Sequence, residues 1–106
     1  MTKKSIYRIS FLNNATVYEI YAKSIEQSEI FGFIEVENLM FGETNKVVVD
    51  PSEERLKTEF QGVKRTLIPL HAVLRIDIVE KEGIGKITVL PRDGNNIIPA
   101  SNVWDR

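Results

Sequence analysis

The chain has no cysteine, a single histidine and no long uninterrupted run of apolar residues. The lack of cysteine excludes disulfides, thiolate catalysis and cysteine-based metal centres. No stretch approaches the ~20 apolar residues of a transmembrane helix, so no membrane partner is expected. The apolar stretch that follows residues 1–4 is broken by Arg8 and Ser10, and a signal peptide is therefore not predicted. These features predict a cytoplasmic protein.

A strong net charge is also missing. The 14 Lys and Arg against 15 Asp and Glu give 14 − 15 = −1, so binding to DNA through bulk charge is not expected. The distribution is uneven, because residues 19–54 carry nine acids and two bases (2 − 9 = −7) and residues 55–75 carry five bases and one acid (5 − 1 = +4). Either these opposite fields align subunits or hold an acidic partner, or the fold brings the segments together and they neutralise each other.

Apolar and polar residues alternate with a period of two along most of the chain, which predicts strands. Two runs, residues 6–12 and 16–23, flank Asn13-Asn14 and predict a β-hairpin. Further strands are predicted over residues 30–37, 46–49, 64–68, 73–80 and 86–90. Residues 24–29 are predicted to be a loop or a single helical turn, and residues 69–72 a bend. We expect a single β-rich domain over residues 1–90 and a poorly packed C-terminal tail over residues 91–106.

One helix is predicted at about residues 51–60. Asp50 is a natural N-cap, Pro51 suits the first helical position, and Glu53 stands at the capping-box spacing. About ten residues do not form a stable helix alone, so this helix must dock on the sheet. The predicted fold is mainly β: a bent antiparallel sheet or a small barrel with one inserted helix, with an open α+β sheet as the alternative.

His71 is the only imidazole, and it lies in the predicted bend. No nucleophile-elbow motif surrounds a serine, and no ligand spacing suggests a metal site, so no catalytic residue, metal or cofactor is predicted. A structural or surface histidine is the first interpretation. The alternative is a small-molecule-binding protein or enzyme that holds His71 in a pocket beside a carboxylate such as Asp77.

Eight of the nine aromatic residues precede residue 61, which is more than a small core needs. Phe31 and Phe33 share the second face of the predicted strand over residues 30–37, so they are candidate interface residues, with core packing as the other interpretation. If RNA is the ligand, the predicted phosphate and base contacts are Lys64, Arg65, His71 and Arg75.

Three runs carry a resemblance to a known family: FGFIEVE at residues 31–37, VVDPSEERL at 48–56 and PLHAVLRI at 69–76. With the hairpin, they resemble a bacterial family catalogued as domain of unknown function 1820, over residues 6 to 82. That family has no established activity, so the resemblance implies no residue roles.

A more distant resemblance points to small Sm-like or SH3-like barrels. Sm-like proteins have a glycine, an apolar residue, an acid and a methionine in their third element, and here the same order is given by Gly32, Ile34, Glu37 and Met40. The run at residues 71–73 is similar to the His-Ala-Ile of the bacterial Sm-like RNA chaperone. In that chaperone a lysine before the histidine helps to hold RNA, and here a leucine stands in its place. This resemblance implies a small barrel fold, and the leucine removes one of the residues by which that family holds RNA.

The sequence therefore favours a non-enzymatic binding module that acts through protein contacts, self-association included, or through RNA. A protein that binds a small molecule or catalyses a reaction at a His71 pocket is one alternative. A structural subunit of a larger complex is the other.

Overall fold

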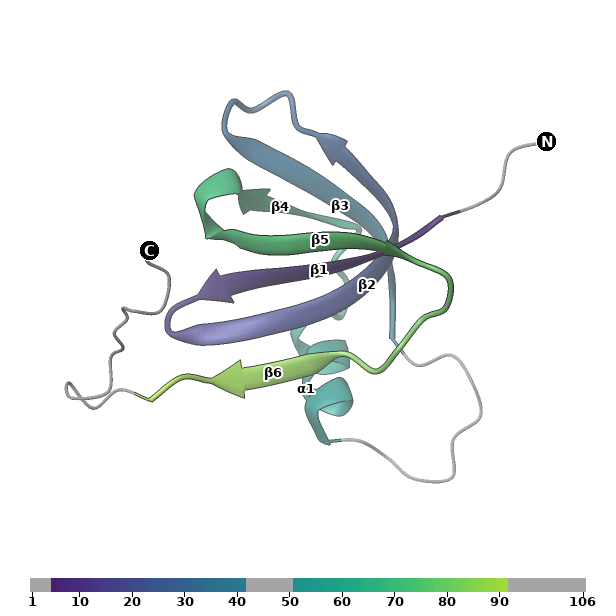
Figure 1. The fold of residues 1–106 in the computed structure, drawn as a ribbon, viewed down its shortest axis with the longest axis vertical. Helices are drawn as coiled ribbons and strands as arrows, with labels where there is room; N and C mark the ends of the chain where they lie inside the picture. The colour runs from purple at the N-terminus through teal and green to yellow at the C-terminus, as the bar shows by residue number, and fades with distance from the viewer. Residues whose placement is uncertain (1–4, 42–50, 92–106) are drawn as a thin grey trace.

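The computed structural model describes residues 5–41 and 51–91, which form six strands, one α-helix and one short 3-10 helix (Figure 1). In chain order these are β1 (Ile6–Asn13), β2 (Thr16–Gln27), β3 (Phe33–Met40), α1 (Pro51–Glu59), β4 (Arg65–Pro69), η1 (Leu70–Ala72), β5 (Val73–Val79) and β6 (Lys86–Val89). The strands form one antiparallel sheet in the order β4-β3-β2-β1-β5, and β6 pairs with β2. The prediction of a mainly β fold with a bent antiparallel sheet and one helix is confirmed.

The sheet is not closed into a barrel, because β4 and β5 do not pair. The resemblance to Sm-like and SH3-like barrels therefore stays a prediction, as does the domain boundary at residue 90. The predicted strand over residues 46–49, the helix cap at Asp50 and the predicted tail from residue 92 onward lie outside the described residues. No helix within the described segments is long and apolar enough to cross a membrane.

The predicted hairpin of β1 and β2 is confirmed, although its turn lies one residue later than the predicted Asn13-Asn14. Its two-residue turn consists of Asn14 and Ala15, whose φ angles are 52° and 62°. Two successive residues with positive φ make a type I′ turn, which matches the right-handed twist of the paired strands. Asn13, at the end of β1, pairs with Thr16 at the start of β2.

The strand β2 is longer than predicted and joins three neighbours. One edge pairs with β1, and the other pairs first with β6 and then with β3. The prediction of a loop or helical turn over residues 24–29 was wrong for residues 24–27, because β2 continues to Gln27 and Ile25 pairs there with Val36 of β3. Only Ile25 is apolar in this part of β2, so pairing with β3 rather than side-chain pattern makes it a strand.

The third strand begins later than predicted, at Phe33 instead of residue 30. Gly32 has a φ of +83°, which a residue in a strand does not adopt and which glycine reaches without steric cost. Residues 30–32 therefore belong to the turn between β2 and β3. The helix (predicted at about residues 51–60), the bend over residues 69–72 and the two last strands lie within about one residue of their predicted places.

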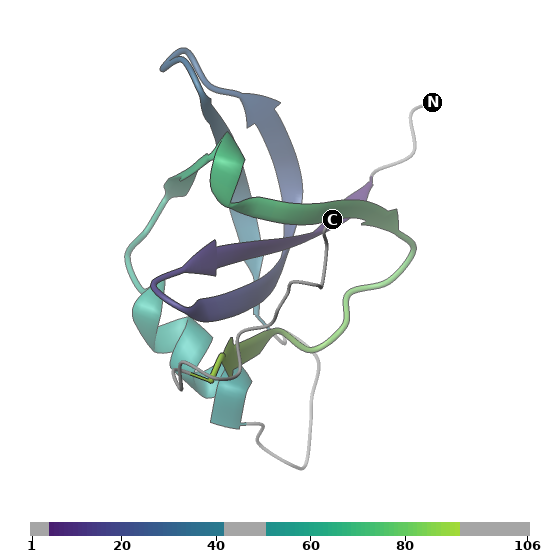
Figure 2. The same cartoon turned by 60° about the vertical axis from the view of Figure 1, so that its left-hand side comes forward.

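Irregularities in the ladders curl the sheet around one apolar face. Asn38 of β3 has a φ of +58°, and opposite it the alternation of β2 shifts, since Ala22 and Ile25 both contribute to the core although they are three residues apart. A second irregularity separates Ser10 from Phe11 in the pairing of β1 with β5. In Figure 2, β1 and β5 run across the direction of β3, as expected for a strongly bent sheet.

The core lies inside this curl, and its most deeply buried side chains are Ile9, Ile20, Ala22, Val36 and Leu56. Leu56 belongs to α1. The first turn of α1 also accepts hydrogen bonds from the backbone at β6 and just before it. The backbone N–H of Ile87 donates to Ser52 Oγ at 3.5 Å, and that of Gly85 donates to the buried Glu53 at Oε2 at 3.4 Å. The helix thus docks on the sheet, as predicted from its short length.

Gly85 lies close to the helix α1. A Cβ at this position would lie 2.6 Å from Leu56 Cδ1 and 3.2 Å from the Glu19 carbonyl oxygen. Gly85→Ala should therefore lower the free energy of unfolding by about 1–3 kcal/mol in urea titrations, because overpacking forces neighbouring groups to move. Leu56→Ala should relieve part of this cost, so the double variant should lose less than the sum of the single losses. Additive losses would contradict this explanation.

Candidate functional site

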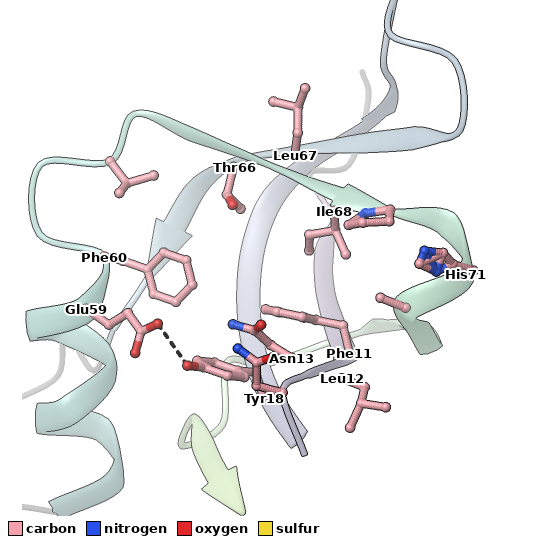
Figure 3. A pocket seen from close by; sticks show the side chains of 14 residues that line it. Phe11, Leu12, Asn13, Tyr18, Glu59, Phe60, Thr66, Leu67, Ile68 and His71 are labelled. Atoms are coloured by element: carbon pink, nitrogen blue, oxygen red, sulfur yellow. Dashed lines mark hydrogen bonds between the residues drawn. The ribbon is translucent and has the colours of Figure 1, made fainter. Parts of the chain in front are cut away.

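An open pocket of about 420 Å³ lies between the β1–β2 turn, the end of α1, β4 and η1 (Figure 3). Its floor is aromatic. The rings of Phe11 and Tyr18 stack with centroids 5.1 Å apart, and Phe60 meets Tyr18 edge to face at 6.4 Å. Ile68 adds a buried aliphatic wall. The pocket therefore has an apolar interior that a flat or aliphatic group could enter.

The polar groups of the pocket are at its rim. The Tyr18 hydroxyl donates a 2.8 Å hydrogen bond to Glu59 Oε2, which joins β2 to the end of α1. The other polar lining side chains include Asn13, Asn14, Thr66 and His71. Burial raises the pKa of the Tyr18 hydroxyl, and the hydrogen bond to Glu59 raises it further. Tyr18 is therefore a protonated donor at neutral pH.

His71 lines this pocket, as the hypothesis of a His71 site requires. Figure 3 places it across the pocket from Glu59, so these two side chains do not form a pair. Asp77, the carboxylate that the sequence suggested, does not line the pocket. Its Oδ2 accepts from Arg8 at 2.6 Å and lies 3.0 Å from Arg75 Nε. The hydrogen bond from Arg8 lowers the pKa of Asp77, and Arg75 lowers it further.

The basic residues predicted for RNA contact do not form one free basic surface. Arg65 Nε lies 2.9 Å from Glu37 Oε2, and its Nη1 lies 3.8 Å from Glu35 Oε1, both on β3. Arg75 pairs with Asp77 on its own strand, whereas Lys64 is exposed just before β4. The acidic and basic segments of the chain meet at Arg65, which favours the interpretation that they neutralise each other.

The two predicted interface phenylalanines differ in their surroundings. Phe31 is 96% exposed in the turn between β2 and β3, whereas Phe33 is half-buried and pairs with Pro69 at the start of β3. Ile30 in the same turn and Leu70 of η1 are also exposed. We call Ile30, Phe31 and Leu70 the apolar tip.

A second apolar surface lies on β5. Ile76 pairs with Ile9 and Ile78 pairs with Tyr7, so both isoleucines share a face with the core. They are nevertheless 41% and 70% exposed, and Leu74 is exposed as well. The sequence predicted the alternation of these three residues with Arg75 and Asp77, but alternation does not reveal whether a face is covered.

Sequence reasoning missed the contribution of Tyr18, Glu59 and Phe60 to the pocket. Tyr18 and Glu59 are 41 residues apart in the chain, and each belongs to an element whose amphipathic pattern has a structural explanation. No short-range spacing could have brought them together. Within residues 5–41 and 51–91, no three metal-ligating acids or histidines cluster closely enough to hold a metal ion.

Comparison with known families agrees with the runs noted in the sequence. The model of a family described as domain of unknown function DUF1820 matches residues 5–101. The chain belongs to this family. No curated protein and no solved structure matches it. The matched region of this DUF1820 protein contains both apolar surfaces and the pocket.

The Tyr18–Glu59 pair predicts a specific loss of stability in alkali. Because the pKa of Tyr18 in the folded protein lies above its ordinary value of 10.0, the folded state holds this proton more tightly than the unfolded state. The resulting contribution is fully present below pH ~10 and is lost as the pH rises through the folded-state pKa. Tyr18→Phe should therefore lose less unfolding free energy than the parent between pH ~9 and pH ~11, measured by urea titration. Equal losses would contradict this role of Tyr18.

Proposed function

We propose that this DUF1820 protein is a non-enzymatic cytoplasmic module that binds other protein chains. The observation that carries the proposal is the position of Phe31, an aromatic side chain that is 96% exposed at the apolar tip. Large aromatic residues are frequent anchors of protein interfaces and are seldom left this exposed on a monomer.

The turn that presents Phe31 is held by three backbone hydrogen bonds. Phe33 N–H donates to the Ile30 carbonyl at 3.3 Å, Ser28 N–H donates to the Phe33 carbonyl at 3.1 Å, and Leu70 N–H donates to the Gly32 carbonyl at 2.8 Å. The last of these bonds ties the turn to η1. Because the backbone of this turn is already held, less of the chain has to be ordered on binding than on a free loop, so this geometry suits an interface.

The charge arrangement supports a protein rather than an RNA partner. A phosphate backbone is held by clustered, unpaired Lys and Arg, and two of the four predicted RNA contacts, Arg65 and Arg75, are already in ion pairs. Binding of RNA is the alternative ligand class. It would be recognised by an affinity that falls steeply with salt and by its loss in the Lys64→Ala/Arg65→Ala variant.

The pocket with His71 on its rim carries a second candidate function, the binding of a small molecule. The observation in its favour is the aromatic floor of Phe11 and Tyr18 beneath a polar rim, the usual composition of a ligand site. A structural subunit of a larger complex is a special case of the main proposal, in which the partner is permanent.

The apolar tip can be tested with a photo-crosslinking amino acid placed at position 31 in cells. We expect one discrete crosslinked protein product, because an anchored interface residue meets the same partner each time. The matched control carries the crosslinker at Ile84, an exposed apolar residue outside the tip. The same products from both positions, or none from position 31, would contradict the proposal.

Phe31→Ala separates this role from a structural one. The variant should change the free energy of unfolding by no more than about 0.5 kcal/mol, because the side chain makes little contact within the chain. It should at the same time remove the partner that the crosslinker identifies. A large loss of stability, or undiminished binding of that partner, would show that Phe31 is not the anchor.

A further inference from the structure

The free edges of the sheet are not equally protected. The outer edge of β6 faces α1, where Ser52 and Glu53 accept hydrogen bonds from Ile87 and Gly85. The strand β4 has five residues and ends at Pro69, which cannot donate to a ladder. Among the described residues, β5 has seven residues, no proline and no lysine, and pairs only with β1. It is the edge best suited to accept another strand.

The side chains of β5 suit a partner as well as its backbone does. Ile76 and Ile78 continue the inner face of the sheet beyond β1, yet water covers much of both. A strand added to this edge would extend the same face and bury them. Burial of apolar surface contributes about 25 cal/mol per Å², so a partner at this position is favoured.

We infer that the occupant of this edge is a second copy of the chain, which pairs its own β5 antiparallel to the first about a two-fold axis at Ile76. In this register Ile76 lies opposite the partner's Ile76, and Leu74 lies opposite the partner's Ile78. Arg75 then lies opposite the partner's Asp77, and the same pair repeats across the axis. The strand is thus complementary to itself both in charge and in apolar character.

Charge selects this register among those that a two-fold axis allows. An axis at Arg75 would place two arginines opposite each other, and an axis at Asp77 would do the same with two aspartates. An axis at Ile78 would place Ile76 opposite the partner's Glu80. Like charges directly opposite each other destabilise a strand pair, whereas opposite charges stabilise it. Only the axis at Ile76 matches both the charged and the apolar residues of β5.

Arg75 can exchange its own Asp77 for the Asp77 of the second copy. The Arg75 side chain is 72% exposed, so its guanidinium is free to turn from its own Asp77 toward the partner's Asp77. Asp77 keeps its 2.6 Å contact with Arg8 in either case. This inference extends the proposed function to a named partner and uses a surface other than the apolar tip, so that each can fail without the other.

The first test compares Ile76→Lys with Ile84→Lys by light scattering after size exclusion. The two isoleucines are matched, with 41% and 40% of their surface exposed, but only Ile76 lies on the axis. The parent and Ile84→Lys should both have twice the 12.1 kDa mass of the chain. Ile76→Lys should be monomeric, with a dissociation constant raised about 100-fold or more by two facing charges. A monomeric parent, or a dimeric Ile76→Lys, would overturn the inference.

The second test reads the register directly and does not depend on Ile76→Lys being folded. The chain has no cysteine, so one introduced thiol is unique. Ile76→Cys should form a disulfide-linked dimer under mild oxidation, since opposite residues bring their Cβ atoms within about 4.5–5.5 Å. Leu74→Cys and Ile78→Cys should not crosslink when alone but should crosslink when mixed. Efficient crosslinking of either one alone, or none at position 76, would contradict the register.

The third test reverses the charges. Arg75→Asp should dissociate the dimer, because the introduced carboxylate would face the partner's Asp77, whereas Lys57→Glu on α1 makes a similar change of charge away from β5 and should not. The triple variant Arg8→Asp/Arg75→Asp/Asp77→Arg inverts the whole group and restores every opposite-charge contact, so it should dimerise again. A dimeric Arg75→Asp would overturn the assignment of this pair.

If the chain is monomeric while position 31 still crosslinks a different protein, this inference fails and the proposed function stands.

Discussion

Every other strand of the sheet pairs either with β2 or with a strand that is itself paired with β2. The strands β1, β3 and β6 pair with it, β5 follows from β1, and β4 follows from β3. The alternation of β2 shifts between Ala22 and Ile25, opposite Asn38 with its positive φ, and an irregularity of this kind bends a strand and increases its twist. Without it the two halves of the inner face could not enclose one core, and the ends of the sheet would not approach each other.

The same bend explains where the exposed apolar surfaces lie. The sheet curls far enough to bury Ile9 and Ile20, but not far enough for β4 and β5 to pair, and the isoleucines of β5 are therefore left at an uncovered edge. At the turn between β2 and β3, the chain reverses around Gly32 and projects Phe31 outward. A small domain whose core takes only part of its apolar side chains has the remainder available for partners, and this relation underlies the proposed function.

The sequence was most informative where local chemistry decides the structure. The hairpin was predicted from its two asparagines, with a turn one residue too early, and Pro51 at the helix start and the bend at residues 69–72 were also predicted from neighbouring residues. Long-range pairing decided the rest. Polar residues at the end of β2 became a strand because β3 lies beside them, and alternation in the run around Gly32 suggested a strand where its φ requires a turn. The exposure of Ile76 and the meeting of Tyr18 with Glu59 depend on which elements cover each other, and periodicity carries no information on that.

Amide hydrogen exchange followed by mass spectrometry, on the intact chain and on Ile76→Lys, tests most directly whether β5 is left open by its own chain and covered by a second copy. We predict that peptides from β5 exchange slowly in the parent and much faster in the variant, whereas peptides from β2 stay protected in both. Equal protection of β5 in the two proteins would contradict the account. It would mean either that the chain itself covers this edge or that nothing does.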